Sequence, residues 1–150
     1  MVTLRPAEAA DVATLRAIAA AAYEPYVPRI GRAPAPMSAD YAEAVRSRQA
    51  WVAVDDGEIA GLVVLVPQPG YLLLENVAVR PAAQGRGVGA RLMALAESEG
   101  RRLELSEIRL YTNEAMTENL AYYRRLGYTE THRAEQEGFR RVYFRKRLAG

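Results

Sequence analysis

Three glycines follow a short apolar segment and precede an amphipathic one. Gly85, Gly87 and Gly89 alternate with other residues, and a short turn separates them from the apolar residues 77–79. Glycine tolerates backbone φ angles that other residues avoid, and without a Cβ its N–H can approach an anion closely. Behind the glycines a helix is expected, so its unpaired N–H groups and its dipole would face the same turn. This arrangement predicts a cradle for a pyrophosphate.

The expected helix follows from hydrophobic spacing. Val88, Leu92 and Leu95 repeat at i, i+4 and i+7, and Glu99-Gly100 reads as a stop signal. The pattern predicts a helix over residues 87–98.

Other phosphate-binding loops have different spacing. A Walker A loop needs Lys-Ser/Thr after its last glycine, whereas Gly89 is followed by Ala90-Arg91. A dinucleotide fingerprint is Gly-x-Gly-x-x-Gly near the start of a parallel βαβ unit, which differs from the spacing here. Gln84, Gly87 and Gly89 instead match Gln/Arg-x-x-Gly-x-Gly/Ala, and the segment closely resembles the acetyl-CoA motif of the GCN5-related N-acetyltransferase (GNAT) family. The alternative is a glycine-rich turn that binds nothing.

The resemblance implies acetyl-CoA as co-substrate, no metal, and an acyltransferase that moves acetyl to an amine through a tetrahedral intermediate. It also implies that the Val79 amide lies near the thioester oxygen. The cofactor-binding residues that it implies are Val77, Val79, Gln84, Gly85, Arg86, Gly87, Val88, Gly89, Ala90, Asn119 and Tyr123. A catalytically silent acyl-CoA-binding module of the same fold is the alternative function.

A second segment resembles the family near its end. Tyr123 stands four residues before Gly127-Tyr128, where family members often have a tyrosine that donates a proton to the departing CoA thiolate. Asn119, one turn earlier, would contact the cofactor arm. Tyr122 is the next candidate donor. The alternative for Tyr123 is a core aromatic on one helical stripe with Met116 and Leu120.

The amine must lose a proton before it attacks. An alkyl amine with a pKa near ~10.4 is about 0.04% neutral at pH 7, so a base is needed. The single histidine, His132, falls in a probable surface strand. Glu75 is the stronger candidate, because residues 75, 77 and 79 of one strand are expected to share a face with Val79. The alternative is a solvated or salt-bridged Glu75.

Residues 23–37 contain too many prolines for regular structure and form the longest expected loop. In the family this segment overhangs the acceptor end of the cleft. Tyr26 and Arg29, together with Glu75, are therefore the expected substrate-binding residues. Arginine pairs with carboxylate and phosphate in bidentate fashion, so Arg29 would favour an amine that bears an anion. The alternative is a solvated loop charge. A loop of this length suits a small-molecule amine better than a protein N-terminus.

The order of elements matches the GNAT fold, an α+β domain. We expect one domain over residues 1–150, with a mixed, mostly antiparallel sheet of about six or seven strands splayed beside the fourth strand and flanked by about four helices. Ser38 is expected to cap the second helix. In the last strand Val142 and Phe144 alternate with Arg141 and Tyr143, which predicts one solvated face. The expected strands are 2–5, 51–54, 58–66, 71–79, 107–112, a strand from 128 onward and the last strand to about 148.

The amino-acid composition excludes several classes of function. Among 150 residues there is no cysteine and one histidine, so disulfides and thiolate catalysis are excluded and metal sites would need carboxylates alone. A net charge of +2 with interspersed acids is too weak to indicate nucleic-acid binding. There is no signal-like or membrane-length apolar run, so a cytoplasmic location without membrane contact is expected. The resemblance leaves a homodimer through the C-terminal strands possible.

Overall fold

The computed structural model describes residues 1–148, which form a seven-stranded sheet in the order β1-β2-β3-β4-β5-β7-β6. All neighbouring strands are antiparallel except β4 and β5, which are parallel. The expected mixed α+β architecture is confirmed. The strands are β1 (Val2–Pro6), β2 (Ala50–Asp55), β3 (Glu58–Gln68), β4 (Tyr71–Val79), β5 (Glu107–Asn113), β6 (Thr129–Gln136) and β7 (Phe139–Arg147).

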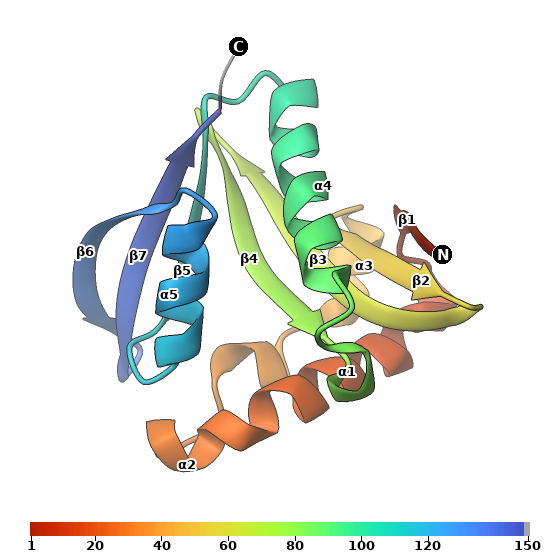
Figure 1. The fold of residues 1–150 in the computed structure, drawn as a ribbon, viewed down its shortest axis with the longest axis horizontal. Coiled ribbons are helices and arrows are strands. Elements are labelled where there is room, and N and C mark those ends of the chain that lie inside the picture. Colours follow the sequence, from red (N-terminus) through yellow and green to blue (C-terminus); the bar gives the residue numbers. More distant parts are fainter. Residues whose placement is uncertain (149–150) are drawn as a thin grey trace.

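Helices cover both faces of the sheet (Figure 1). The α-helices are α1 (Val12–Tyr23), α2 (Val27–Ile30), α3 (Tyr41–Arg46), α4 (Val88–Arg102) and α5 (Thr117–Arg125), and short 3₁₀ turns are η1 (Ala9–Asp11), η2 (Glu24–Tyr26), η3 (Ala35–Ser38) and η4 (Pro81–Ala83). None of the helices within residues 1–148 is long and apolar enough to cross a membrane. The same residues contain no cluster of three or more His, Asp or Glu side chains suited to a metal ion.

The β2–β3 hairpin forms where the sequence indicates a tight turn. Asp56 has φ 51° and Gly57 has φ 80°, and two successive positive φ angles are what a tight type I′ hairpin turn requires. Aspartate tolerates this region and glycine adopts it freely.

The parallel strands β4 and β5 separate along their length. Residues 71–73 pair with residues 107–109, and no pairing between the two strands continues beyond them. In Figure 1 the two strands diverge towards α1 and α2, which cross below the opening. The splay next to the fourth strand is therefore confirmed, and it leaves one edge of β4 free of a strand partner.

A β-bulge lies at Glu75, within the same stretch of β4. Leu74 pairs with Leu65 and Asn76 pairs with Val64, so Glu75 has no partner residue on β3. A bulge bends its strand and shifts the alternation of side chains. Leu72 and Leu74 accordingly pack in one core, whereas Ala78 packs in the other.

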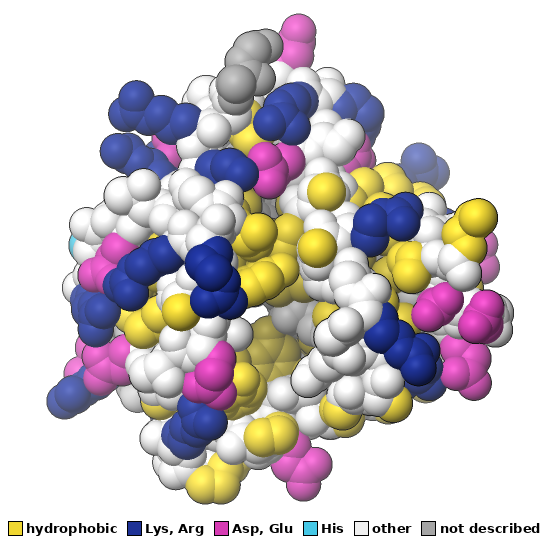
Figure 2. All heavy atoms as spheres, viewed as in Figure 1, with side chains coloured by type: hydrophobic (Ala, Val, Ile, Leu, Met, Phe, Trp, Pro, Cys, Tyr) yellow, Lys and Arg dark blue, Asp and Glu magenta, His cyan; other side chains and the backbone are white. Residues whose placement is uncertain are grey.

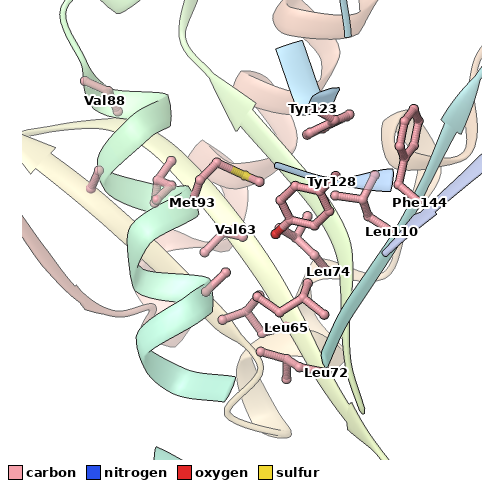
Figure 3. Close-up of a cluster of buried hydrophobic side chains, with 14 of the residues drawn as sticks. Val63, Leu65, Leu72, Leu74, Val88, Met93, Leu110, Tyr123, Tyr128 and Phe144 are labelled. Carbon is pink, nitrogen blue, oxygen red and sulfur yellow. The ribbon is translucent and has the colours of Figure 1, made fainter. Parts of the chain in front are cut away.

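The sheet separates two hydrophobic cores. The core under α4 includes Leu92 and Met93 of the helix and Leu110 and Phe144 of the sheet (Figure 3). The core under α1 and α3 includes Leu15, Ile18 and Tyr41 with strand residues such as Val52 and Leu62. Burial of these apolar surfaces is the main driving force for the fold.

The structure extends the fourth helix beyond its expected end. We expected residues 87–98, but α4 continues to Arg102. Gly100 lies inside the helix, where a Cβ would be 2.5 Å from Leu148 Cδ1. The glycine is thus needed for close packing and does not stop the helix.

The proline-rich segment is more regular than expected. It forms η2, α2 and η3, each with a proline at one of its first two positions. The missing proline N–H is harmless there, because the first N–H groups of a helix have no internal partner. The expected Ser38 cap is also wrong. Asp40 caps α3 and accepts a hydrogen bond from the Glu43 N–H at 3.0 Å.

We predict opposite effects for two glycine-to-alanine changes. A Cβ at Gly61 would lie 2.9 Å from the Ala78 carbonyl oxygen and 3.0 Å from Leu92 Cδ1, so Gly61→Ala should destabilise the fold by ~1–3 kcal/mol. A Cβ at Gly89, at the start of α4, would only meet atoms at 3.6 Å or more, so Gly89→Ala should stabilise by up to about 1 kcal/mol. Urea unfolding measures both. Equal stability of Gly61→Ala and wild type would contradict the close approach of α4 to β3.

Candidate active site

The turn before α4 has the geometry of an anion cradle. Gly85 and Gly87 have φ angles of 83° and 81°, and a Cβ at either position would meet nothing within 4 Å. The first hydrogen bond into the helix runs from the Arg91 N–H to the Gly87 carbonyl, at 3.1 Å. The preceding amides of the first turn therefore have no partner inside the helix, and this turn carries no acidic residue.

Gly89 differs from the other two glycines. Its φ is not positive, because it lies in the first turn of α4. The freedom of glycine to adopt a positive φ is therefore used at Gly85 and Gly87 and not at Gly89. Because Gly89 has no side chain, the space beside Tyr122 and Val79 stays open. A Cβ at this position would lie 3.6 Å from Tyr122 Oη and 3.7 Å from Val79 Cγ2.

The cradle is anchored to the end of β4. Gln84 Nε2 donates a hydrogen bond to the Val79 carbonyl at 3.3 Å, which holds the turn against the strand. The Arg86 guanidinium is exposed, and its contact with Asp55 Oδ2 is long, at 3.9 Å. Arg86 therefore keeps donors available on the solvent side of the turn.

A groove with a volume of about 500 Å³ runs from this turn between α4 and α5. In Figure 2 the same face of the molecule is hollowed at its centre, where hydrophobic side chains gather. The sequence-predicted cofactor residues that line it are Val77, Val79, Gln84, Gly85, Gly87, Val88, Gly89, Ala90, Asn119 and Tyr123. Arg86 is the one predicted cofactor residue outside this lining.

A second, smaller pocket of about 90 Å³ adjoins the groove. It is lined from η3, β4, β5 and β7, and Glu75 is among its residues. Tyr23, Val77, Met116, Asn119 and Tyr123 line both the groove and the pocket. A molecule in the groove and a molecule in the pocket would therefore meet at these side chains.

Tyr123 is both a core residue and a wall of the cavity. Its ring lies 5.6 Å from that of Tyr122, 6.0 Å from that of Tyr128 and 5.9 Å from that of Phe144 (Figure 3). Burial raises the pKa of Tyr123, so the phenol is held protonated. Tyr123 is therefore compatible with both interpretations drawn from the sequence, a core aromatic and a candidate proton donor. Asn119, one turn earlier, is fixed by a long contact from Nδ2 to Thr112 Oγ1 at 3.5 Å.

The alternation expected for residues 75, 77 and 79 is interrupted at Glu75. Val77 and Val79 pack against the α4 core, and Glu75 and Val77 both line the smaller pocket. The strict period of two fails because the bulge occurs at Glu75 itself. Glu75 nevertheless reaches the pocket that adjoins the groove. The pKa of the neighbouring Tyr111 is raised, chiefly by burial. The charge of Arg141 lowers this pKa, and the charge of Glu75 adds to the rise.

A buried hydrogen-bond network that sequence reasoning missed stands beside the pocket. Tyr23 Oη donates to Asn76 Oδ1 at 2.7 Å and also approaches the Val77 carbonyl at 3.0 Å. Asn76 Nδ2 donates to Tyr41 Oη at 2.7 Å, and Tyr41 Oη donates to the Pro36 carbonyl at 2.6 Å. The network joins α1, β4, α3 and η3. Its one sequence signal is Asn76, a polar residue beside Glu75 in a strand that is apolar elsewhere.

The two substrate-binding residues expected in the proline-rich segment lie at the groove mouth. Arg29 Nη1 pairs with Glu118 Oε1 at 2.6 Å, and its guanidinium lies 5.1 Å from the Tyr26 ring centroid. The hydrogen bond from Arg29 lowers the pKa of Glu118 to about 2. Tyr26 and Glu118 line the groove, and Arg29 lines neither cavity. The role of Arg29 towards an acceptor stays a prediction.

His132 and Arg141 differ in their exposure to solvent. His132 is exposed on β6 and stacks on Tyr143 at 4.3 Å, in agreement with a surface strand histidine. Arg141 was expected on the solvated face of β7, but it is buried and lines the smaller pocket. The expectation fails because Arg141 packs over the rings of Tyr111 and Phe139, in a pocket that residues of η3 also line.

Solved structures of similar fold include three acetyltransferases. The ribosomal-protein-S18-alanine N-acetyltransferase of Escherichia coli is 16% identical over 100% of this chain and 96% of its own, with a TM-score of 0.81. A putative acetyltransferase of Salmonella typhimurium, solved with its cofactor acetyl-CoA, is 19% identical over 100% and 95%, with a TM-score of 0.77. Nourseothricin acetyltransferase is 27% identical over 67% and 65%, with a TM-score of 0.62.

A comparison with curated protein sequences finds no match. The family model described as "Acetyltransferase (GNAT) family" matches residues 14–128, which span the chain from α1 to the residue after Gly127. Those residues include the glycine cradle, both cavities' shared wall and Tyr123. The chain therefore belongs to the Acetyltransferase (GNAT) family and is an acyltransferase of the N-acetyltransferase class.

Proposed function

We propose that this chain transfers the acetyl group of acetyl-CoA to the primary amine of a small molecule. The observation that carries the proposal is the meeting of the long groove and the small pocket at Tyr123, Asn119 and Val77. The groove suits an elongated co-substrate with a phosphate end, and the pocket suits a compact acceptor. The amine nitrogen attacks the thioester carbonyl, a tetrahedral intermediate forms, the C–S bond breaks, and CoA leaves as a thiolate.

The residues present fit acetyl-CoA. The unpaired amides at the start of α4, the open space at Gly85 and Gly87 and the exposed Arg86 suit a pyrophosphate. The edge of β4 that lacks a strand partner leaves backbone groups for the amide-containing arm. In this arrangement the Val79 N–H is the group that we propose for the developing oxyanion.

Glu75 is the proposed base. It lines the acceptor pocket, and a carboxylate there would accept the amine proton directly or through a water molecule. Because only about 0.04% of an alkyl amine is neutral at pH 7, this step has a large effect on the rate.

Tyr123 is the proposed donor to the leaving sulfur. Because burial raises the pKa of Tyr123, full proton transfer to a thiolate with a pKa near ~8.5 becomes less favourable than for a free phenol. A hydrogen bond from the intact phenol to the thiolate avoids this cost and still stabilises the leaving group.

The small pocket volume and the η3 residues that form part of its wall support a small-molecule acceptor. Nourseothricin acetyltransferase, by its name, acts on a small molecule, which also supports this acceptor class. A protein N-terminus is the second candidate, since the Escherichia coli enzyme of similar fold acts on a ribosomal protein. A homodimer and a cytoplasmic location stay predictions.

A panel of small amines and short peptides, with detection of released CoA thiol, tests the proposal. We expect turnover with at least one small amine. Acetyl-CoA binding without turnover on any amine or peptide would instead favour the silent acyl-CoA-binding module.

The first prediction concerns the cradle. Gly87→Val places a β-branched residue at φ 81°, which costs of order 1–3 kcal/mol of strain and should distort the turn. We expect the Kd for acetyl-CoA, measured by calorimetry, to rise at least tenfold. Gly70→Val is the matched control, because Gly70 also has a positive φ of 84° and open space but lies in the distant β3–β4 turn. Unchanged affinity in a folded Gly87→Val protein would place the cradle elsewhere.

The second prediction concerns the leaving group. Tyr123→Phe should lower kcat by roughly ten- to a hundredfold, the worth of one hydrogen bond to a charged group, with little change in acetyl-CoA affinity. Tyr128→Phe is the control, because the Tyr128 hydroxyl is buried without a hydrogen-bond partner among the described residues. If both variants keep the wild-type kcat, Tyr123 serves only the core.

The third prediction concerns the base. Glu75→Gln should lower kcat/KM by about 100-fold at pH 7. The deficit should shrink as the pH rises to 9, because the neutral fraction of the amine grows about tenfold per pH unit. Initial rates across this range measure the effect, with Glu114→Gln as a control on a residue that lines neither cavity. A deficit that is constant with pH would indicate binding rather than proton removal.

A further inference from the structure

Arg141 is a buried charge in the acceptor pocket. Its side chain is 8% exposed, and it lines the pocket together with Glu75 and Tyr111. The charge of a guanidinium is retained in proteins at all ordinary pH values, so the pocket permanently contains a cation. A buried charge is costly unless it is paired and hydrogen-bonded.

The contacts of Arg141 leave its donors largely unused. The guanidinium lies 4.4 Å from the Tyr111 ring centroid and 5.6 Å from that of Phe139. Stacking on ring faces holds the guanidinium plane but leaves its edge N–H groups available. Within residues 1–148 its one ion pair is a 4.0 Å contact with Glu137 Oε2, whose carboxylate is 75% exposed, and no side-chain hydrogen bond involves Arg141.

The other arginines near the acceptor end are engaged. Arg29 pairs with Glu118 at 2.6 Å. Arg32 Nη1 donates to the Glu137 carbonyl at 3.3 Å, and its guanidinium lies 4.0 Å from the Phe139 ring centroid. Neither residue lines the pocket. Arg141 is thus the guanidinium that an anion in this pocket would meet.

We propose that the acceptor carries a carboxylate as well as an amine, and that Arg141 binds the carboxylate while Glu75 faces the amine. The substrate class is a small aminocarboxylate, such as an amino acid. The inference rests on the proposed transfer of acetyl to a small-molecule amine. Arg141 is then the residue that selects among amines, because a bidentate guanidinium–carboxylate pair in a buried site discriminates strongly against a neutral analogue.

The size and charge of the pocket agree with this class. A volume of about 90 Å³ is several times the ~10–15 Å³ that a cavity needs to hold one water molecule, so it suits a compact polar head. Glu75 and Arg141 place opposite charges in one pocket, so a molecule with both an ammonium and a carboxylate is complementary to it.

The test compares L-amino acids with the corresponding L-amino acid amides as acceptors, with rates expressed per concentration of neutral amine. The wild-type protein should favour the carboxylate member of a pair by at least tenfold in kcat/KM. Arg141→Met should abolish this preference through a higher KM for the carboxylate member, so that acids and amides then react with similar kcat/KM. Arg140→Met is the matched control, because the neighbouring Arg140 is 75% exposed and contacts Glu114.

A second variant does not depend on removing a buried residue. Glu137→Gln removes the exposed carboxylate that contacts Arg141 at 4.0 Å. We expect it to lower the KM for amino acids about two- to fivefold, the typical strength of an exposed ion pair, and to leave the amides unchanged. An unchanged KM for amino acids would count against the assignment even if Arg141→Met failed to fold.

The outcomes separate this inference from the proposed function. Turnover of amines without any preference for the carboxylate, or equal losses on acids and amides in Arg141→Met, would overturn the role of Arg141 while the acetyl transfer stands. Binding of an amino acid to the CoA-loaded protein that Arg141→Met abolishes, without turnover of any amine, would keep the carboxylate site and overturn the proposed transfer. If no amino acid binds and no amine of any kind is acetylated, both proposals are overturned.

Discussion

The incomplete pairing of β4 with β5 is the constraint on which the rest of the structure depends. Only residues 71–73 of β4 meet residues 107–109 of β5, after which each strand keeps a single neighbour. Backbone groups at an unpaired edge are normally satisfied by another chain segment, by water or by a ligand. The open edge therefore creates the groove, and everything around it either holds the strands apart or lines the space between them.

Three features stabilise the open geometry. The bulge at Glu75 bends β4 where the separation begins. The hydrogen bonds among Tyr23, Asn76 and Tyr41 then tie the free part of β4 to α1 and α3, and burial raises the pKa values of both tyrosines. A fully satisfied polar network inside a core specifies one arrangement, since any shift would leave a buried group unpaired. Across the mouth, the Arg29–Glu118 pair joins α2 to α5.

The cavities differ in their electrostatics. The groove begins at the positive end of α4, where the first turn has no acidic residue, and it favours an anion. The pocket contains Glu75 and the buried Arg141, and it favours a molecule with charges of both signs. Tyr123, held neutral by burial, stands between them. In the proposed function the three regions serve in turn as a phosphate site, a neutral junction and a polar acceptor site.

The sequence by itself determined what depends on local chemistry. The hairpin at Asp56-Gly57, the cradle at Gly85 and Gly87 and the helix behind it follow from turn preferences and hydrophobic spacing, which act between residues close in the chain. Family membership followed from the same segments, because the motif is contiguous. The tertiary structure alone decided the bulge at Glu75, the burial of Arg141 and the partner of Arg29. A bulge adds one residue to a ladder without a clear sequence signal, packing over aromatic rings can bury an arginine on a strand face that reads as solvated, and Arg29 meets Glu118 across 89 residues of chain. Such contacts are set by how the layers pack, and no pattern of neighbouring residues encodes them.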